Sequence, residues 1–167
     1  MSDDPAAGKV DARPTVYVET SVISYLAARP SGDLVTRANQ KVTADWWAVR
    51  GRFQPVISQL VLDEITRGDA SYAVQRHALV RTLPLLDITD EVDALAEALL
   101  RKASLPSKAS SDAVHVAVAA LNGIDLLVTW NLKHIANAVI RKRLEGICRN
   151  EGFDPPGICT PAELLEE

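Results

Sequence analysis

The chain has 167 residues, of which 47% are hydrophobic and 24% are charged, and its formal net charge is −4. This length fits one domain with one sizeable hydrophobic core. The negative net charge excludes a protein that binds polyanions through overall positive charge, although a local basic rim would still permit nucleic-acid binding. Aromatic residues make up only 5% of the chain, which is low for a protein that stacks single-stranded bases.

The two cysteines, Cys148 and Cys159, lie outside any C-x-x-C pattern. Their number and spacing argue against a zinc site or a disulfide scaffold, so we expect two buried thiols in a reducing compartment. The sequence holds no long apolar run, and residues 1–13 are acidic and proline-containing, unlike a signal peptide. We therefore expect a cytoplasmic protein with no membrane partner, a flexible tail over residues 1–13 and a single domain over residues 14–167.

The pattern of apolar residues predicts short strands that alternate with helices. In chain order the expected strands cover residues 15–19, 55–57, 83–88, 125–131 and 158–160, and the expected helices cover residues 22–29, 32–50, 58–68, 69–83, 89–103, 110–124 and 136–152. Strands that are separated by one or two helices need crossover connections, which favours a parallel sheet covered on both faces. The predicted fold class is α/β, with three α/β/α layers around a short-stranded parallel sheet.

Two details of the predicted helices bear on packing. The helix over 32–50 is expected to bury a stripe formed by Leu34, Val35, Ala38, Val42, Trp46 and Val49. Because Trp46 and Trp47 are adjacent, we expect one of the two indoles to be exposed, as at a protein interface. For the predicted helix over 110–124, Ser110 or Ser111 is the expected N-cap.

Polar residues stand at the ends of two predicted strands. Glu19 follows the apolar run "VYV" and Asn131 follows "LLVTW", with Thr20 and Thr129 beside them. Ligands of open parallel sheets bind beyond the carboxyl ends of the strands. An unpaired buried carboxylate costs several kcal/mol, so Glu19 at the inner end of a buried strand predicts a compensating partner. We expect the functional site at this edge.

Two more acids are expected to reach the same edge of the sheet. Glu64 flanks the inner stripe of its helix, whereas Asp63 falls on the outer face. Asp112 opens an almost wholly apolar helix, and His115 lies one turn later on the same face. Each residue also has a purely structural explanation, such as a first-turn acid that complements the helix dipole or a core histidine bonded to a carboxylate. Taken together, the three acids predict a carboxylate cluster.

A cluster of carboxylates in a partly dry crevice needs a compensating cation, because like charges repel one another. Oxygen ligands without a set of cysteines and histidines favour Mg²⁺ or Mn²⁺ over zinc. Such an ion can bind phosphates, activate water and stabilise a leaving oxygen, which is the chemistry of phosphodiester hydrolysis. The sequence contains no G-x-x-x-x-G-K-[ST] or G-x-G-x-x-G motif, so nucleotide-triphosphate and dinucleotide sites lack their phosphate cradle.

The order of the segments "VYVETSVISYL", "ISQLVLDEI", "SSDAVHVAVAALNGIDLLVTWN" and "PAELL" resembles the PIN-domain proteins, particularly VapC-type toxins of type II toxin–antitoxin systems. The resemblance covers residues 15–165. It implies a PIN fold, a Mg²⁺- or Mn²⁺-dependent endoribonuclease, a small antitoxin partner and a homodimer. It also implies that Glu19, Glu64 and Asp112 are metal ligands, and that Asn131 is a fourth catalytic residue. Glu19 and Asn131 stand where the family usually has aspartate.

Residues around this cluster are expected to contact substrate or to support the ligands. They are Thr20, Ser21, His115, Thr129, Lys133 and His134. We expect Thr20 and Ser21 to hold Glu19 or donate to phosphate, and Thr129 to bond Asp112 or a water molecule.

Two other functions stay open at this point. One is a PIN-fold module that binds RNA or protein without cutting, which the substitutions at Glu19 and Asn131 favour. The other is a phosphotransfer receiver domain, which needs an acceptor aspartate at the end of a central strand and a lysine at the end of the last strand. The segments "LLDI" and "ICT" do not supply that arrangement.

Overall fold

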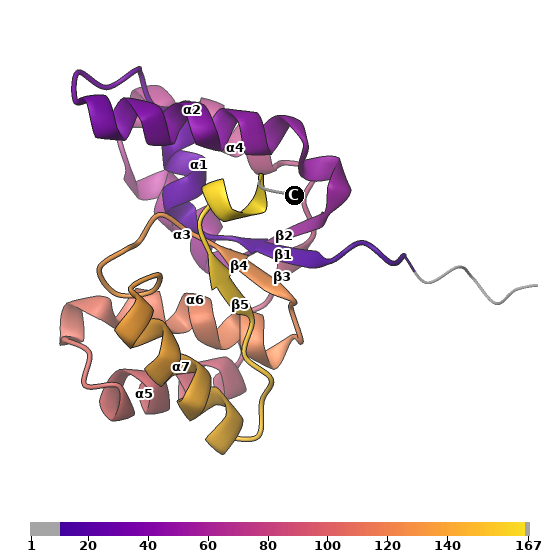
Figure 1. Cartoon of the computed structure of the whole chain (residues 1–167), viewed down its shortest axis with the longest axis vertical. Coiled ribbons are helices and arrows are strands. Elements are labelled where there is room, and N and C mark those ends of the chain that lie inside the picture. The colour runs from indigo at the N-terminus through magenta and orange to yellow at the C-terminus, as the bar shows by residue number, and fades with distance from the viewer. Residues whose placement is uncertain (1–10, 166–167) are drawn as a thin grey trace, which may run out of the picture.

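The computed structural model describes residues 11–165 (Figure 1). The strands are β1 (Thr15–Val18), β2 (Gln54–Ser58), β3 (Leu85–Leu86), β4 (Leu126–Val128) and β5 (Gly157–Cys159). The helices are α1 (Thr20–Ala27), α2 (Leu34–Ala48), α3 (Gln59–Arg67), α4 (Ala70–Val80), α5 (Asp90–Lys102), α6 (Ser110–Leu121) and α7 (Ala138–Asn150). Each predicted strand and helix is present, and most are shorter at their ends than the sequence pattern suggested.

The five strands form one parallel sheet in the order β3-β2-β1-β4-β5. Figure 1 shows α1, α2 and α4 on one side of the sheet and α5, α6 and α7 on the other; α3 packs against α1 and α4. The predicted three-layer α/β architecture is therefore confirmed. The chain builds outward from β1 to β3 and then returns to add β4 and β5 on the other side of β1. In such sheets the crevice between the two halves, here beyond β1 and β4, is where ligands bind.

The central strand is buried because helices cover both faces of the sheet. Val16, Tyr17 and Val18 of β1 are fully buried, and parallel strands covered in this way are apolar on both faces. Helix α6 lies against the sheet with most of its residues buried. A polar side chain at the end of β1 therefore enters the protein interior rather than solvent.

The structure corrects the predicted packing of α2. Leu34 and Val35 are 79% and 69% exposed, whereas Trp46 and Trp47 are both buried. The guanidinium of Arg50 lies over the indole ring of Trp47, 4.5 Å from the ring centroid. An aromatic ring is broad enough to reach the core from the side of a helix, so neither indole is left exposed.

The inward face of α2 carries polar side chains with definite partners, which explains this shift of the stripe. Thr43 is fully buried; its hydroxyl donates to the carbonyl oxygen of Asn39 and accepts from the indole nitrogen of Trp130 at 2.7 Å. The Gln40 amide bonds the backbone of the loop before α2, accepting from the Ser31 nitrogen at 2.9 Å. Hydropathy alone does not identify these positions as inward.

The expected serine cap of α6 is also wrong. A short 3₁₀ helix, Ser107–Ala109, runs directly into α6, and Ala109 occupies the N-cap position without a side-chain hydrogen bond. Residues 1–10 of the predicted tail lie outside the described residues. Arg13, the last residue of that predicted segment, donates to the Gly51 carbonyl oxygen at 2.9 Å. Within residues 11–165, no helix has both the length and the apolar character needed to cross a membrane.

Candidate active site

Glu19 stands at the point where β1 ends and α1 begins. Its backbone nitrogen donates to the Val128 carbonyl oxygen at 3.1 Å, which joins the end of β1 to β4. The residue is only 5% exposed. Its Oε2 atom accepts hydrogen bonds from the Ser21 backbone nitrogen at 3.1 Å, from the Ser21 hydroxyl, and from the Thr129 hydroxyl at 2.7 Å. One carboxylate oxygen is thus held in place by α1 and β4, while Oε1 makes no hydrogen bond to a described residue.

Glu64 approaches Glu19 from α3. Its Oε1 atom accepts from the Thr20 hydroxyl at 2.8 Å and from the His115 Nε2 atom at 2.5 Å. Burial opposes the charge on Glu64, but the hydrogen bonds and the positive charge of His115 outweigh it and lower the pKa of the carboxyl below its ordinary value. Glu64 is therefore ionised at neutral pH. The neighbouring Asp63 is exposed on the opposite side of α3, as predicted.

His115 lies between the two glutamates and is fully buried. Its Nε2 atom is 2.5 Å from the Glu64 carboxylate and 3.8 Å from Oε1 of Glu19. Burial favours the neutral imidazole, but the hydrogen bond to Glu64 and the charges of both glutamates outweigh it and raise the pKa of His115. The histidine thus offsets part of the negative charge of the pair. The expected hydrogen bond from His115 to a carboxylate is present.

Asp112 lies one turn before His115 on α6 and faces the loop that follows β4. Its Oδ2 atom is 2.9 Å from Nδ1 of His134. The backbone nitrogen of His134 donates to Oδ1 of Asn131 at 3.0 Å, so the Asn131 side chain stabilises the conformation at the start of this loop. Lys133, between them in the sequence, is exposed. The loop therefore places His134 beside Asp112 and leaves Lys133 exposed to solvent one residue earlier.

The ligand atoms of Glu19, Glu64 and His115 all lie within 4.8 Å of one another. The carboxylate of Asp112 is outside that group, although it is near enough to contribute to the raised pKa of His115. Each glutamate has one oxygen that is fixed by donors and one that makes no described hydrogen bond. Hard carboxylate oxygens of this kind suit Mg²⁺ or Mn²⁺. The carboxylate oxygens of Glu19 and Glu64 therefore fit a divalent cation, with the His115 ring beside them and hydrogen-bonded to Glu64.

The sequence profile of the PIN domain family matches residues 16–140, which hold Glu19, Glu64, Asp112 and Asn131. The chain belongs to the PIN domain family. This confirms the family that the sequence motifs indicated, and no curated protein matches the chain.

Solved structures agree with this PIN fold. A chain of a toxin–antitoxin complex from Klebsiella pneumoniae superimposes with a TM-score of 0.57 at 19% identity, covering 88% of this chain and 98% of that one. The toxin VapC20 of Mycobacterium tuberculosis, which cleaves the sarcin–ricin loop, has a TM-score of 0.56 at 20% identity, covering 85% and 100%. At these identities the likeness shows the fold.

Two supporting contacts in the PIN domain differ from those expected. Thr129 donates to Glu19 rather than to Asp112, and Thr20 donates to Glu64 rather than to Glu19. Strands β1 and β4 are neighbours, with Val18 opposite Val128, so the residues directly after them, Glu19 and Thr129, lie side by side. The expected contact between Ser21 and Glu19 is present.

The sequence reasoning missed two residues of this polar cluster, Tyr17 and Ser58. The Tyr17 hydroxyl is 2.7 Å from Nδ1 of His115 and 2.7 Å from the Ser58 hydroxyl. The available signal was a tyrosine inside an apolar strand, because a buried tyrosine hydroxyl usually has a hydrogen-bond partner. Ser58 precedes α3 at the N-cap position but makes no capping hydrogen bond, because its hydroxyl bonds Tyr17 instead.

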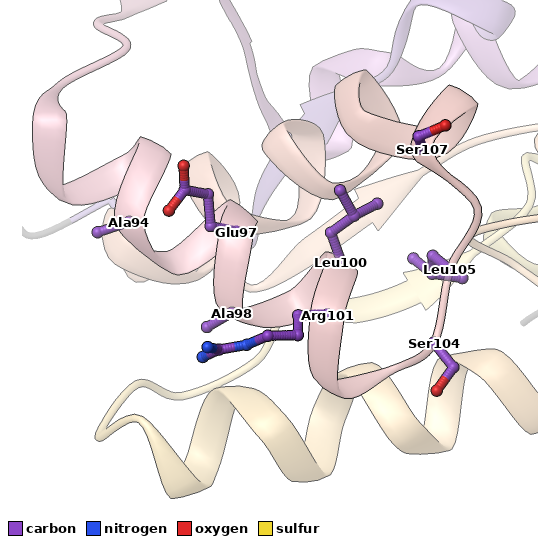
Figure 2. A pocket seen from close by; sticks show the side chains of 8 residues that line it. All are labelled: Ala94, Glu97, Ala98, Leu100, Arg101, Ser104, Leu105 and Ser107. Carbon is purple, nitrogen blue, oxygen red and sulfur yellow. The ribbon is translucent and has the colours of Figure 1, made fainter.

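A separate pocket lies away from these acids. Figure 2 shows it on α5 and the segment that follows, lined by Ala94, Glu97, Ala98, Leu100, Arg101, Ser104, Leu105 and Ser107. Its charged side chains are one glutamate and one arginine, and it contains none of the residues that the sequence singled out. The chemistry-bearing residues of this PIN domain therefore gather beyond β1 and β4 and not in this pocket.

Proposed function

We propose that this PIN domain is a Mg²⁺- or Mn²⁺-dependent endoribonuclease and the toxin of a toxin–antitoxin pair, acting in the cytoplasm. The observation that carries the proposal is the convergence of Glu19 and Glu64 with His115 beyond the ends of β1 and β4, where the two halves of the parallel sheet meet. Asp112 lies beside them and is paired with His134. Paired acids at this place are arranged to hold a cation and the phosphate of a substrate.

We assign Glu19, Glu64 and Asp112 as the residues that hold the cation. When bound there, a divalent cation supplies Lewis-acid chemistry that activates water and stabilises the leaving oxygen of the phosphodiester. The protein's part is to hold the carboxylates in place. Ser21 and Thr129 hold Glu19, and α1 and α6 hold Glu64 through Thr20 and His115.

The loop after β4 is the proposed contact for RNA. His134 presents a ring that is already oriented by Asp112 at 2.9 Å, and the exposed Lys133 adds a positive charge that suits a phosphate. Asn131 shapes the loop through its bond to the His134 nitrogen. We propose that these residues place the substrate backbone over the glutamates, so that hydrolysis leaves a 3′-hydroxyl and a 5′-phosphate.

We also propose a small antitoxin partner and a homodimer. Of the two solved structures with this fold, one is a chain of a toxin–antitoxin complex and the other is the toxin VapC20. In this chain Leu34 and Val35 of α2 and Val74 of α4 are exposed to solvent at 69–79%. Apolar side chains of this size on helix surfaces suit contacts with another protein chain.

The proposal is tested by cleavage of a total-RNA pool in Mn²⁺, because a pool does not require the substrate to be known. Wild type is compared with wild type plus chelator and with Asp112→Asn. Discrete fragments from wild type alone would support the metal-dependent nuclease. Fragments that persist with chelator and in Asp112→Asn would contradict it.

One observation favours a second candidate, a PIN-fold module that binds RNA without cutting. The amide oxygen of Asn131 already accepts a hydrogen bond from the backbone of its own loop, and asparagine adds no negative charge to a cation site. Such a module would retain RNA affinity in the presence of chelator and would produce no fragments. RNA binding measured by fluorescence anisotropy, with and without chelator, separates the two functions.

A further inference from the structure

Five polar side chains from five elements form one continuous hydrogen-bonded chain through the interior. It runs from Ser58 at the end of β2 to Tyr17 on β1, His115 on α6, Glu64 on α3 and Thr20 on α1. The successive contacts are 2.7, 2.7, 2.5 and 2.8 Å. Ser58, Tyr17 and His115 are each 0% exposed. Among the described residues, neither Ser58 nor Tyr17 makes a hydrogen bond to a glutamate.

The Glu64 end of this chain fixes the position of one hydrogen. Glu64 is a carboxylate and can only accept, so the Nε2 atom of His115 must carry the hydrogen that it donates. The Nδ1 atom then either accepts from the Tyr17 hydroxyl or donates to it, and Ser58 serves as donor or acceptor on the far side. The hydroxyl of Tyr17 therefore satisfies the buried ring nitrogen in both protonation states of His115.

Among the described residues, the two ring nitrogens of His115 have one hydrogen-bond partner each, Glu64 and Tyr17. Its Nε2 atom meets Glu64 at 2.5 Å and lies 3.8 Å from Glu19, and Nδ1 has Tyr17 as its hydrogen-bond partner among the described residues. With both nitrogens engaged, the ring holds Oε1 of Glu64, while Oε2 makes no hydrogen bond to a described residue. A ligand oxygen kept in one place is what a cation site requires.

We propose that Tyr17 is a positioning residue for the cation site: its hydroxyl fixes the His115 ring, and the ring fixes the carboxylate of Glu64. The inference rests on the proposed function, because it assigns Glu64 as a ligand. It extends that function to a strand residue that is buried beneath the site and contacts neither cation nor RNA. Direct hydrogen-bond partners of a metal ligand typically change metal affinity by about 10–100-fold when they are removed. Tyr17 acts through His115, one contact further out, so we expect an effect at the lower end of that range.

Tyr17→Phe is the variant that isolates this role. Phenylalanine keeps the ring, which packs against His115 with 5.8 Å between ring centroids, and removes only the hydroxyl. The matched control is Tyr72→Phe, which removes a hydroxyl from a ring on α4 that packs beside Arg29. Circular dichroism and thermal unfolding of each variant establish that it is folded. Ser58→Ala is the second variant, because it leaves Tyr17 in place and removes only the far end of the chain.

The first measurement is Mn²⁺ binding by isothermal titration calorimetry, which needs no RNA. We expect Tyr17→Phe to bind Mn²⁺ about 10-fold more weakly than wild type, with Tyr72→Phe unchanged and Ser58→Ala in between. The second is a long-range ¹H–¹⁵N spectrum of the imidazoles. The chain contains three histidines, and we expect the His115 ¹⁵N signals to move in Tyr17→Phe and those of His77 to stay in place.

The outcomes separate this inference from the proposed function. Equal Mn²⁺ affinity in wild type and Tyr17→Phe, while wild type cuts RNA, would overturn the role of Tyr17 and leave the nuclease intact. Absence of Mn²⁺ binding by wild type would overturn both. If Tyr17→Phe fails to fold, Ser58→Ala decides the matter. Weaker Mn²⁺ binding together with shifted His115 signals supports the positioning role of the hydrogen-bonded chain, and wild-type values for both overturn it.

Discussion

The contact between Thr129 and Glu19 provides a quantitative test of how the site is held. Thr129 is fully buried; its hydroxyl donates to the Glu19 carboxylate at 2.7 Å and accepts from the Asn131 backbone nitrogen at 2.9 Å. Thr129→Val keeps the shape of the side chain and removes both hydrogen bonds, together with the 3.5 Å contact to the Ser21 hydroxyl. No cavity is created, so the change in stability reports on the lost hydrogen bonds and on the groups they leave unpaired.

The size of the effect follows from the two bonds. A hydrogen bond to a charged group contributes about 1.5–3 kcal/mol and a neutral one about 0.5–1.5 kcal/mol. Ser21 continues to donate to the same oxygen of Glu19, which favours the lower part of the first range. We expect Thr129→Val to lose about 2–3 kcal/mol of unfolding free energy. With a urea m-value of about 2 kcal/mol/M, the unfolding midpoint falls by about 1–1.5 M.

The assay is urea unfolding followed by circular dichroism, carried out with chelator so that bound metal adds no stability. Thr82→Val is the control, because Thr82 is exposed on the surface and its replacement should change stability by less than about 0.5 kcal/mol. A loss in Thr129→Val no larger than that of the control would refute the reasoning, since it would mean that Thr129 does not hold Glu19.

Two glycines and two cysteines give further predictions. A Cβ atom at Gly68 would lie 2.7 Å from Nη2 of Arg76, whose guanidinium is buried and bonded to backbone oxygens. We expect Gly68→Ala to destabilise the protein by about 1–3 kcal/mol in the same urea assay, and a stable variant would contradict that packing. Gly146 lies within α7 with open space around it, so Gly146→Ala should stabilise by about 0.5–1 kcal/mol; a loss of stability would count against this assignment. Burial raises the pKa of Cys148 to about 11 and that of Cys159 to about 12. At pH 8 we expect no reaction of the folded protein with Ellman's reagent and two reactive thiols in denaturant, and rapid labelling of the folded protein would refute the buried placement.

The sequence was sufficient for the architecture because the relevant signals are local. Alternation of short apolar runs with amphipathic segments predicts a parallel α/β fold, and the structure confirms it down to five strands and seven α-helices within the described residues. The face of α3 that carries Glu64 also followed from helical spacing. The order of the strands was not accessible in this way, because it depends on which strands pair across the sheet.

The supporting contacts of the site depend on that pairing and were only partly predictable. Thr129 was expected beside Asp112, but the adjacency of β1 and β4 brings it to Glu19 instead. The hydrogen bonds of Tyr17 were missed because its partners, Ser58 and His115, are 41 and 98 residues away in the sequence. The inward face of α2 was misjudged because Thr43 is buried by a hydrogen bond to Trp130 rather than by its hydropathy.

The central claim is that Glu64 acts as a ligand in a metal-dependent ribonuclease, and its neighbour on α3 offers the sharpest test. Cleavage of the RNA pool in Mn²⁺ is measured for Glu64→Gln and for Asp63→Asn, each of which removes one negative charge from the same helix. We predict that Asp63→Asn cuts like wild type and that Glu64→Gln loses about 100-fold or more of the rate, since a catalytic metal contributes several kcal/mol. Equal cleavage by the two variants would contradict the assignment of the site.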